Sequence, residues 1–136
     1  MLTYDHKIRV RYSEVDRMGF LYHAHYVDYY DVARTEALRM LGTSNYDLEA
    51  TGCMLPVLEV VSNYKKPAHY DDLLTVRVRV EELPVVRMVF RYEVFRENGE
   101  LINTGRVTLA FMRSDSKRAC RAPEQLLKYL RPYFPK

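Results

Sequence analysis

The hydrophobic periodicity of this chain changes at about His25, and this change constrains the fold more than any other feature. From there the apolar residues recur at three- and four-residue steps, which places them in one stripe along a helix: Val27, Tyr30, Ala33, Ala37 and Leu41. Gly42 follows, where a helix C-terminus favours a residue that tolerates left-handed dihedrals. We therefore predict one long helix from about residue 25 to residue 41, and its two alanines let it lie close to a flat surface such as a sheet.

Strand patterns stand on both sides of this helix. Before it, residues 7–12 alternate, with Ile8, Val10 and Tyr12 on one face. After a short helical turn over 46–50, four more segments read as strands: 57–61, 75–81, 87–96 and 101–112. The β-branched run at 57–61 is typical of a strand that is covered on both faces.

Turn and helix signals separate and close these strands. The Asn98-Gly99 pair predicts a hairpin turn, and Gly105 indicates a bulge or a close backbone approach. A short amphipathic helix begins at Pro123 and is stopped by Pro132.

The order of elements predicts an α+β fold: an antiparallel sheet of about five strands packed against one long helix, in the order β-α-β-β-β-β, with a short C-terminal helix. With 136 residues, of which 48% are hydrophobic, the chain forms a single domain spanning 1–136. The second face of the sheet would hold Val57, Val61, Val89 and Phe95. Because such a face needs cover, we expect at least a homodimer.

Composition excludes several classes of protein. No apolar run approaches the about 20 residues of a membrane span, and residues 1–7 lack the apolar stretch of a secretory signal. Cys53 and Cys120 lack metal-ligand spacing and fit a reducing compartment, so we expect a cytoplasmic protein. The net charge of +3 is too mild to indicate a nucleic-acid binder. It fits either a solvated face or attraction for a phosphate-bearing small ligand.

Reactive side chains are densest between Tyr12 and Tyr30, where Asp16 lies in the loop before the long helix. A carboxylate there would face the helix N-terminus, whose free N–H groups can stabilise a developing oxyanion. Hydrolysis of an activated acyl group needs such a pair. The alternative interpretation is that Asp16 is a capping residue and that His23 is a hydrogen-bonding group at the helix start.

Other kinds of catalytic site lack support in the sequence. No Gly-x-Ser-x-Gly elbow, phosphate loop or dinucleotide fingerprint occurs. His23 and His25 have no third ligand at helical spacing, and His69 stands alone, so we expect no metal site.

One motif resembles a known family. Asp16 is followed three residues later by Gly19, then by His23-Ala24 and Tyr26 at the helix start, and then by Ala33-Arg34. This pattern resembles the signature of hotdog-fold acyl-CoA thioesterases of the 4-hydroxybenzoyl-CoA thioesterase-like family, and is close to the bacterial thioesterases associated with the Tol-Pal system. Segment 64–72 is similar to the turn after the family's second strand.

The resemblance implies a hotdog fold, in which two subunits join their sheets edge to edge, with sites at the dimer interface and often a tetramer. It implies hydrolysis of an acyl-CoA thioester without a metal or organic cofactor. Asp16 would be the nucleophile or general base, His23 would mark the backbone N–H that polarises the carbonyl, and Tyr12 would help to position the reacting groups. The expected substrate-binding residues are Gly19, Tyr22, His25, Tyr26, Lys65, Lys66 and Arg113.

Two other functions remain open at this point. Hotdog dehydratases pair a loop histidine with an acidic residue of the helix, and Asp28 and Asp31 are available here. A non-catalytic module that binds acyl thioesters is the other alternative, because a fold does not guarantee activity. The sequence also leaves open the acyl group and the choice between coenzyme A and acyl carrier protein.

Overall fold

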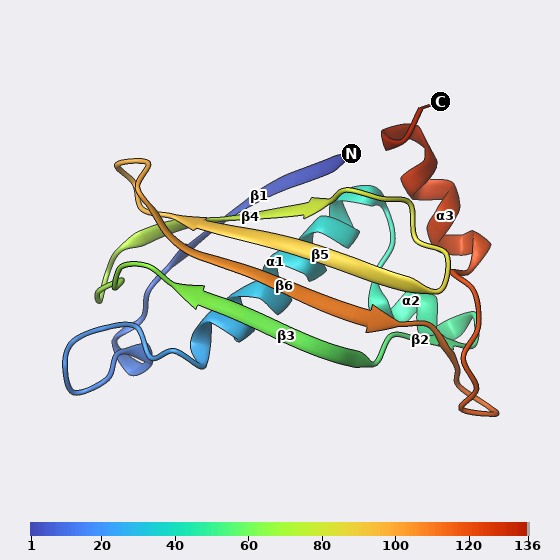
Figure 1. Ribbon diagram of the computed structural model, residues 1–136, viewed down its shortest axis with the longest axis horizontal. Coiled ribbons are helices and arrows are strands. Elements are labelled where there is room, and N and C mark those ends of the chain that lie inside the picture. Colours follow the sequence, from blue (N-terminus) through green and yellow to red (C-terminus); the bar gives the residue numbers. More distant parts are fainter. Residues whose placement is uncertain (136) are drawn as a thin grey trace.

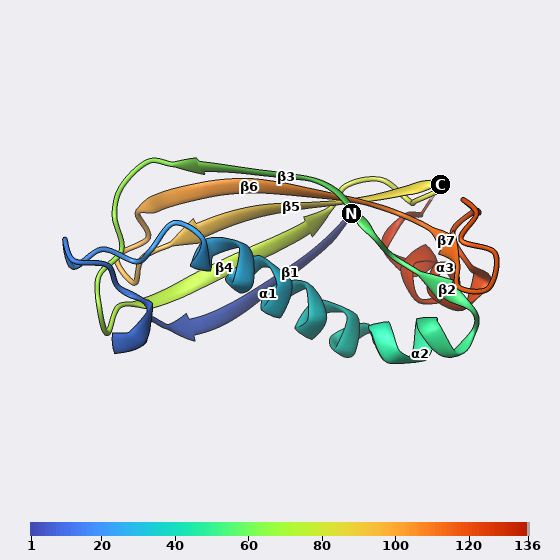
Figure 2. The ribbon, with the colours of Figure 1, turned by 90° about the horizontal axis from the view of Figure 1, so that it is seen from below.

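The structure, a computed structural model, describes residues 1–135. Its centre is a five-stranded antiparallel sheet that curves around one long helix, α1 (Figures 1 and 2). The strand order is β1-β4-β5-β6-β3, so β1 and β3 are the two edges. The elements of this layer pair are β1 (Leu2–Arg9), α1 (His25–Leu41), β3 (Val57–Tyr64), β4 (Leu73–Val80), β5 (Arg87–Phe95) and β6 (Leu101–Ala110). The predicted α+β architecture and element order are confirmed.

Helix α1 lies in the concavity of the sheet and has the predicted bounds. It buries Tyr26, Tyr29, Tyr30, Ala33, Ala37 and Leu38. The buried stripe is turned slightly from the predicted one, since Val27 and Leu41 are only partly buried. Gly42 ends the helix with φ 104°, in the left-handed region.

The concave face of the sheet alternates as expected. Strands β4 and β5 bury Leu74, Val76, Val78, Val80, Met88, Phe90, Tyr92 and Val94. On β6, Gly105 lies against the Tyr30 ring so closely that an added Cβ would overlap the Cζ and hydroxyl of that tyrosine. The Tyr30 ring also stacks on Tyr92, with centroids 4.3 Å apart. The close approach predicted at Gly105 is therefore confirmed.

The first strand begins and ends earlier than predicted. Strand β1 starts at Leu2 and stops at Arg9, because its partner β4 begins at Leu73, opposite Arg9. Val10 is still buried, but its backbone forms hydrogen bonds with the backbone of Asp71 and Asp72, in the loop that precedes β4. Tyr12 lies in a 3-10 turn, η1 (Tyr12–Glu14), so the predicted strand over 7–12 is wrong at its end.

The two predictions about covered apolar surface are also corrected. Strand β3 is an edge strand, and in the single chain Val57, Leu58 and Val60 are exposed rather than covered on both faces. Val57 pairs with Leu109, which places it on the concave side and not on the second face. A strand whose register is set by long-range pairing cannot be placed by its composition alone.

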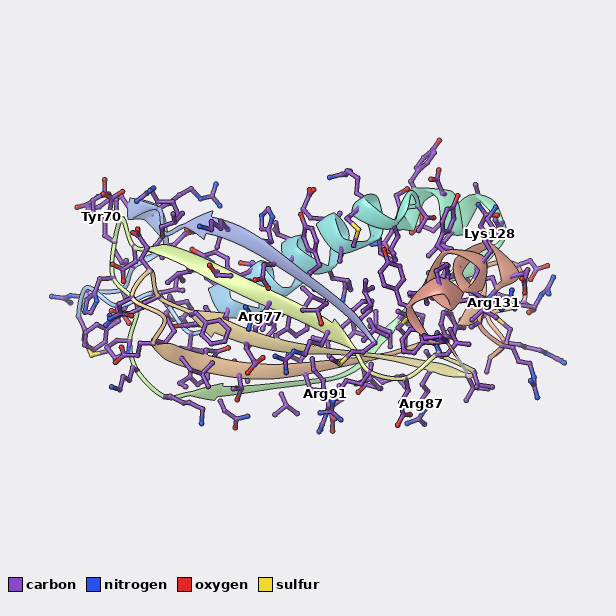
Figure 3. The ribbon with its side chains drawn as sticks, turned by 90° about the horizontal axis from the view of Figure 1, so that it is seen from above. Tyr70, Arg77, Arg87, Arg91, Lys128 and Arg131 are labelled. Atoms are coloured by element: carbon purple, nitrogen blue, oxygen red, sulfur yellow. The ribbon has the colours of Figure 1, made fainter. Side chains whose placement is uncertain are left out.

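The convex face of the sheet is charged rather than apolar. Arginines on neighbouring strands pair with carboxylates across it: Arg77 with Asp5 at 2.8 Å, Arg79 with Glu93 at 2.8 Å, Arg91 with Glu81 at 2.6 Å, and Arg106 with Glu59 at 2.8 Å. Val61, Val89 and Phe95 are partly buried among these pairs. In Figure 3, Arg87 and Arg91 point away from α1. A face covered with charged side chains can remain exposed to water and needs no second subunit to cover it. The convex face therefore does not itself support the expected homodimer.

The remaining elements gather at one end of the sheet (Figures 1 and 2). They are α2 (Asn45–Ala50), β2 (Cys53–Met54), β7 (Met112–Arg113), α3 (Glu124–Leu130) and a 3-10 turn, η2 (Arg131–Tyr133). The long strand predicted over 101–112 ends at Ala110, because Met112 and Arg113 pair with β2 instead. Among residues 1–135, no helix combines the length and apolar character of a membrane span.

Candidate active site

Asp16 closes a tight turn with its own backbone and side chain. Its carbonyl accepts the Gly19 N–H at 3.0 Å, and Gly19 adopts φ 82°. Its Oδ1 accepts the N–H groups of Met18 at 2.9 Å and Phe20 at 3.2 Å. Within the described residues, Oδ2 accepts no hydrogen bond. One carboxylate oxygen is therefore anchored, and the other is free to meet a ligand.

The base of this turn is a small ribbon of backbone bonds. The Asp16 N–H donates to the Phe20 carbonyl at 2.8 Å, and Val15 pairs with Leu21. Phe20 also pairs with His69, and the Leu21 N–H donates to the Ala68 carbonyl at 2.8 Å. The turn that carries Asp16 is thus joined to segment 67–72, which precedes β4.

The same loop runs directly into the N-terminus of α1. The helix begins at His25, with Ala24 at the N-cap and no side chain capping it. The N–H groups of His23 and Ala24 donate to no carbonyl or side chain within residues 1–135. They stand at the positive end of the helix dipole, where an oxyanion is favoured. His25 bonds Asp28 in the first turn, with 2.9 Å between Nδ1 and Oδ2.

Two tyrosines brace this helix start. The Tyr64 hydroxyl, at the end of β3, donates to the His23 carbonyl at 3.1 Å. The Tyr64 ring meets the Tyr26 ring edge-on, with centroids 5.3 Å apart. Burial raises the pKa of Tyr26 to about 12, so this phenol stays protonated and serves packing rather than acid–base chemistry. The sequence motif indicated Tyr26 but gave no role to Tyr64.

Glu14 is a second carboxylate nearby, and it is buried. Its Oε1 accepts the Arg11 N–H at 2.8 Å and the Tyr29 hydroxyl at 2.7 Å, while Oε2 lies 3.0 Å from Arg11 Nη2. Burial alone would raise the pKa of Glu14, but the hydrogen bonds from Arg11 and Tyr29 outweigh it and hold that pKa below its usual value. Glu14 therefore ties η1 to α1, and it has no free oxygen for catalysis.

Most of the predicted site residues meet at this end of the molecule, but not all in the expected way. Tyr12 is 78% exposed and touches Tyr70 edge-on at 5.5 Å; no hydrogen bond joins it to Asp16. The Asp16 side chain bonds the backbone of its own turn, and within residues 1–135 it accepts no hydrogen bond from the start of α1, which it was predicted to face. The Tyr22 ring lies beside the His23 ring, with centroids 4.3 Å apart.

The three predicted cations differ in their surroundings. Lys65 is exposed and forms no ion pair within the described residues, whereas Lys66 Nζ lies 2.7 Å from Glu100. Arg113 is on β7, at the end of the sheet opposite the Asp16 turn, and lies 3.5 Å from Asp115 (Figure 2). Within one chain, Arg113 is therefore not part of this site.

The described residues contain no group of three or more histidine, cysteine, aspartate or glutamate side chains placed to hold a metal ion. The chemistry that the site itself offers is a carboxylate with one free oxygen, in the loop that leads into a helix start with two free N–H groups. Such an arrangement can activate water or attack a carbonyl and can stabilise the negative charge that forms.

Comparisons with known proteins agree with this geometry. The chain is 37% identical to YneP of Bacillus subtilis over 95 residues, which cover 70% of this chain and 69% of that protein. It is 32% identical to the acyl-CoA thioester hydrolase YbgC of Escherichia coli over 100 residues, 74% of this chain and 75% of that one. A crystal structure of DHNA-CoA thioesterase from Staphylococcus aureus matches with a TM-score of 0.83 and 36% identity, over 99% of this chain and 85% of that one.

The fold and these relatives define a hotdog-fold thioester hydrolase, as the motif around Asp16 predicted. The sequence pattern of the Thioesterase-like superfamily matches residues 10–130. The chain belongs to this family.

Proposed function

We propose that the chain hydrolyses an acyl-CoA thioester and that Asp16 is its catalytic carboxylate. The observation that carries the proposal is that the two carboxylate oxygens of Asp16 differ in their hydrogen bonding. Oδ1 is held by the Met18 and Phe20 N–H groups, and Oδ2 is left unbonded within residues 1–135. A carboxylate held in this way keeps its orientation while one oxygen reacts.

The thioester carbonyl oxygen would lie at the N-terminus of α1, against the N–H groups of His23 and Ala24. These donors meet the charge that develops on this oxygen in the transition state, and one such donor commonly contributes about 10²- to 10³-fold to the rate. The Tyr64 hydroxyl supports them indirectly, because it holds the carbonyl of His23.

Two routes use the same oxygen of Asp16. In the first, Oδ2 attacks the carbonyl carbon, the C–S bond breaks, and the resulting mixed anhydride is hydrolysed by water. In the second, Oδ2 takes a proton from the attacking water and returns it to the leaving thiolate. Both routes yield a free acid and the coenzyme A thiol.

Lys65 is the cation that we assign to the phosphates of coenzyme A. It follows Tyr64 at the end of β3, is exposed, and has no carboxylate partner within the described residues. Lys66 would first have to leave Glu100. No organic cofactor or metal enters the proposed mechanism.

A homodimer formed through β3 fits the same site. The edge of β3 has unpaired backbone groups on one side and exposes Val57, Leu58 and Val60, which makes it suited to pairing with a second copy. A two-fold axis would make the two β3 strands antiparallel. The β7 end of the second copy would then lie beside the Asp16 turn of the first, and Arg113 could serve the site across the interface. A tetramer and a cytoplasmic location remain predictions.

The dehydratase alternative is less well supported by the geometry. It needs an acidic residue of the helix to be available, whereas Asp28 bonds His25 and Asp31 lies 3.2 Å from Arg34. We therefore favour hydrolysis.

The test is thiol release from a panel of acyl-CoA esters with short, long and aromatic acyl groups. Turnover of at least one ester supports the proposal and identifies the acyl class. Tight binding of these esters by folded protein without thiol release would instead support the non-catalytic binding module.

A further inference from the structure

We propose that Arg96 is a positioning residue for the Asp16 carboxylate, and that it acts through segment 67–72. The proposal rests on the function assigned above to Asp16. Arg96 lies 80 residues from Asp16 in the chain and belongs to no motif in the sequence, yet a continuous series of direct contacts joins the two.

The first contacts fix segment 67–72 to the end of β5. Arg96 follows the last residue of β5, and its Nη2 donates to the Pro67 carbonyl at 2.6 Å and to His69 Nδ1 at 2.8 Å. The same nitrogen lies 3.8 Å from Asp72 Oδ2, and Nη1 lies 3.3 Å from Glu100. One guanidinium thus holds two acceptors of the segment at once.

The next contacts pass from this segment to the turn. His69 pairs with Phe20 through the backbone, and their rings meet edge-on with centroids 5.5 Å apart. The buried Ala68 accepts the Leu21 N–H at 2.8 Å. Phe20 in turn bonds Asp16 through both its carbonyl and its N–H. A shift of segment 67–72 therefore moves the donor that holds Asp16 Oδ1.

The hydrogen bond from Arg96 also fixes the tautomer of His69. A guanidinium can only donate, so His69 Nδ1 must accept and its proton is on Nε2. The His69 backbone N–H donates to Asp72 Oδ2 at 2.8 Å, which holds the segment from the other side. A lysine at position 96 would keep the charge, but it has no second nitrogen to bond Glu100 while the first bonds segment 67–72, as Nη1 and Nη2 of Arg96 do.

A role in orientation predicts a specific kinetic pattern. Removing the Arg96 fork should misplace Oδ2 without changing the surface that binds coenzyme A. We expect Arg96→Gln to lower kcat about tenfold or more and to leave KM within about twofold. Arg96→Lys should lie between the wild type and Arg96→Gln.

The matched control is Arg77→Gln. Arg77, in β4, also forms a two-point ion pair, with Asp5 at 2.8 and 3.0 Å. Its guanidinium lies over the Phe95 ring, but it forms no hydrogen bond or ion pair with segment 67–72. Its loss should leave kcat unchanged. A fall in kcat as large as that of Arg96→Gln would show that any broken ion pair of the sheet has this effect, and would overturn the proposal.

The double variant Asp16→Asn/Arg96→Gln tests whether Arg96 acts through Asp16. If it does, the double variant is no slower than Asp16→Asn alone, because two residues that act as a unit are not additive. Multiplicative losses, or a change in KM alone, would overturn the proposal.

Amide hydrogen exchange gives a readout that needs no turnover. The N–H groups of Met18 and Phe20 are protected by Asp16 Oδ1, so they should exchange faster in Arg96→Gln and not in Arg77→Gln. Unchanged exchange at both amides would overturn the positioning role. Absence of thiol release by the wild type would instead contradict the proposed function, so the two failures are distinguishable.

Discussion

Asp16 and Phe20 are bonded to each other twice. The Asp16 N–H donates to the Phe20 carbonyl at 2.8 Å, and the Phe20 N–H donates to Asp16 Oδ1 at 3.2 Å. This reciprocal pair closes the turn around Gly19 and directs the second carboxylate oxygen away from the backbone that holds the first. The proposed chemistry depends on this arrangement, because a freely rotating carboxylate would lose the effect of orientation.

Lys65→Gln should weaken the binding of the coenzyme A portion of the substrate. Lys65 is exposed, follows the end of β3, and forms no ion pair within the described residues, so its loss should raise KM for an acyl-CoA several-fold with little change in kcat. The KM for the same acyl group on N-acetylcysteamine, which has no phosphates, should stay unchanged. Equal increases for both substrates would show that Lys65 does not contact phosphate.

Glu14→Gln should lower the free energy of unfolding at neutral pH, and it should make that free energy less dependent on pH in the acid range. The pKa of Glu14 is lowered in the folded state, so the folded state binds this proton more weakly than the unfolded chain does. The resulting stabilisation is full above the ordinary glutamate pKa of about 4.3 and is lost as the pH falls through the lower folded value.

Urea unfolding of the two proteins between pH 3 and pH 7 measures this effect. The difference in the free energy of unfolding between wild type and Glu14→Gln should shrink as the pH falls below about 4.3. The exposed Glu97→Gln variant is the control, and it should follow the wild type throughout. A difference that is constant with pH would contradict the assigned role of the Glu14 charge.

Gly105→Ala should destabilise the protein by about 1 to 3 kcal/mol, the usual cost of overpacking a core. An added methyl group would overlap the Tyr30 ring, which cannot retreat because it stacks on Tyr92. Thermal unfolding measures the loss, and Thr104→Ala on the neighbouring position serves as the control. Equal melting temperatures for Gly105→Ala and wild type would show that the helix is not held this closely to the sheet.

The features that the sequence predicted well depend on local patterns. The period of α1 and the alternation of β4 and β5 are properties of neighbouring residues, and Gly105 marked a close approach because an interior strand glycine usually needs a reason. The position of Asp16 in the loop before α1 followed from the strand and helix periods on either side of it.

The features that the sequence missed depend on long-range pairing. The exposure of β3 follows from its place at the sheet edge, and the charged convex face follows from the register that sets Arg77 beside Asp5. The separation of Arg113 from Asp16 reflects the length of the sheet. The contact between Arg96 and His69 spans 27 residues and has no local signal.

The turnover of Asp16→Asn on an acyl-CoA ester that the wild type hydrolyses tests the role of this carboxylate directly. The asparagine Oδ1 can still accept the Met18 and Phe20 N–H groups, so the turn should persist while the reacting oxygen is replaced by an amide nitrogen. We predict that kcat falls about 100-fold or more, with an unchanged circular dichroism spectrum. Turnover close to that of the wild type, from a folded Asp16→Asn protein, would contradict the catalytic role assigned to Asp16.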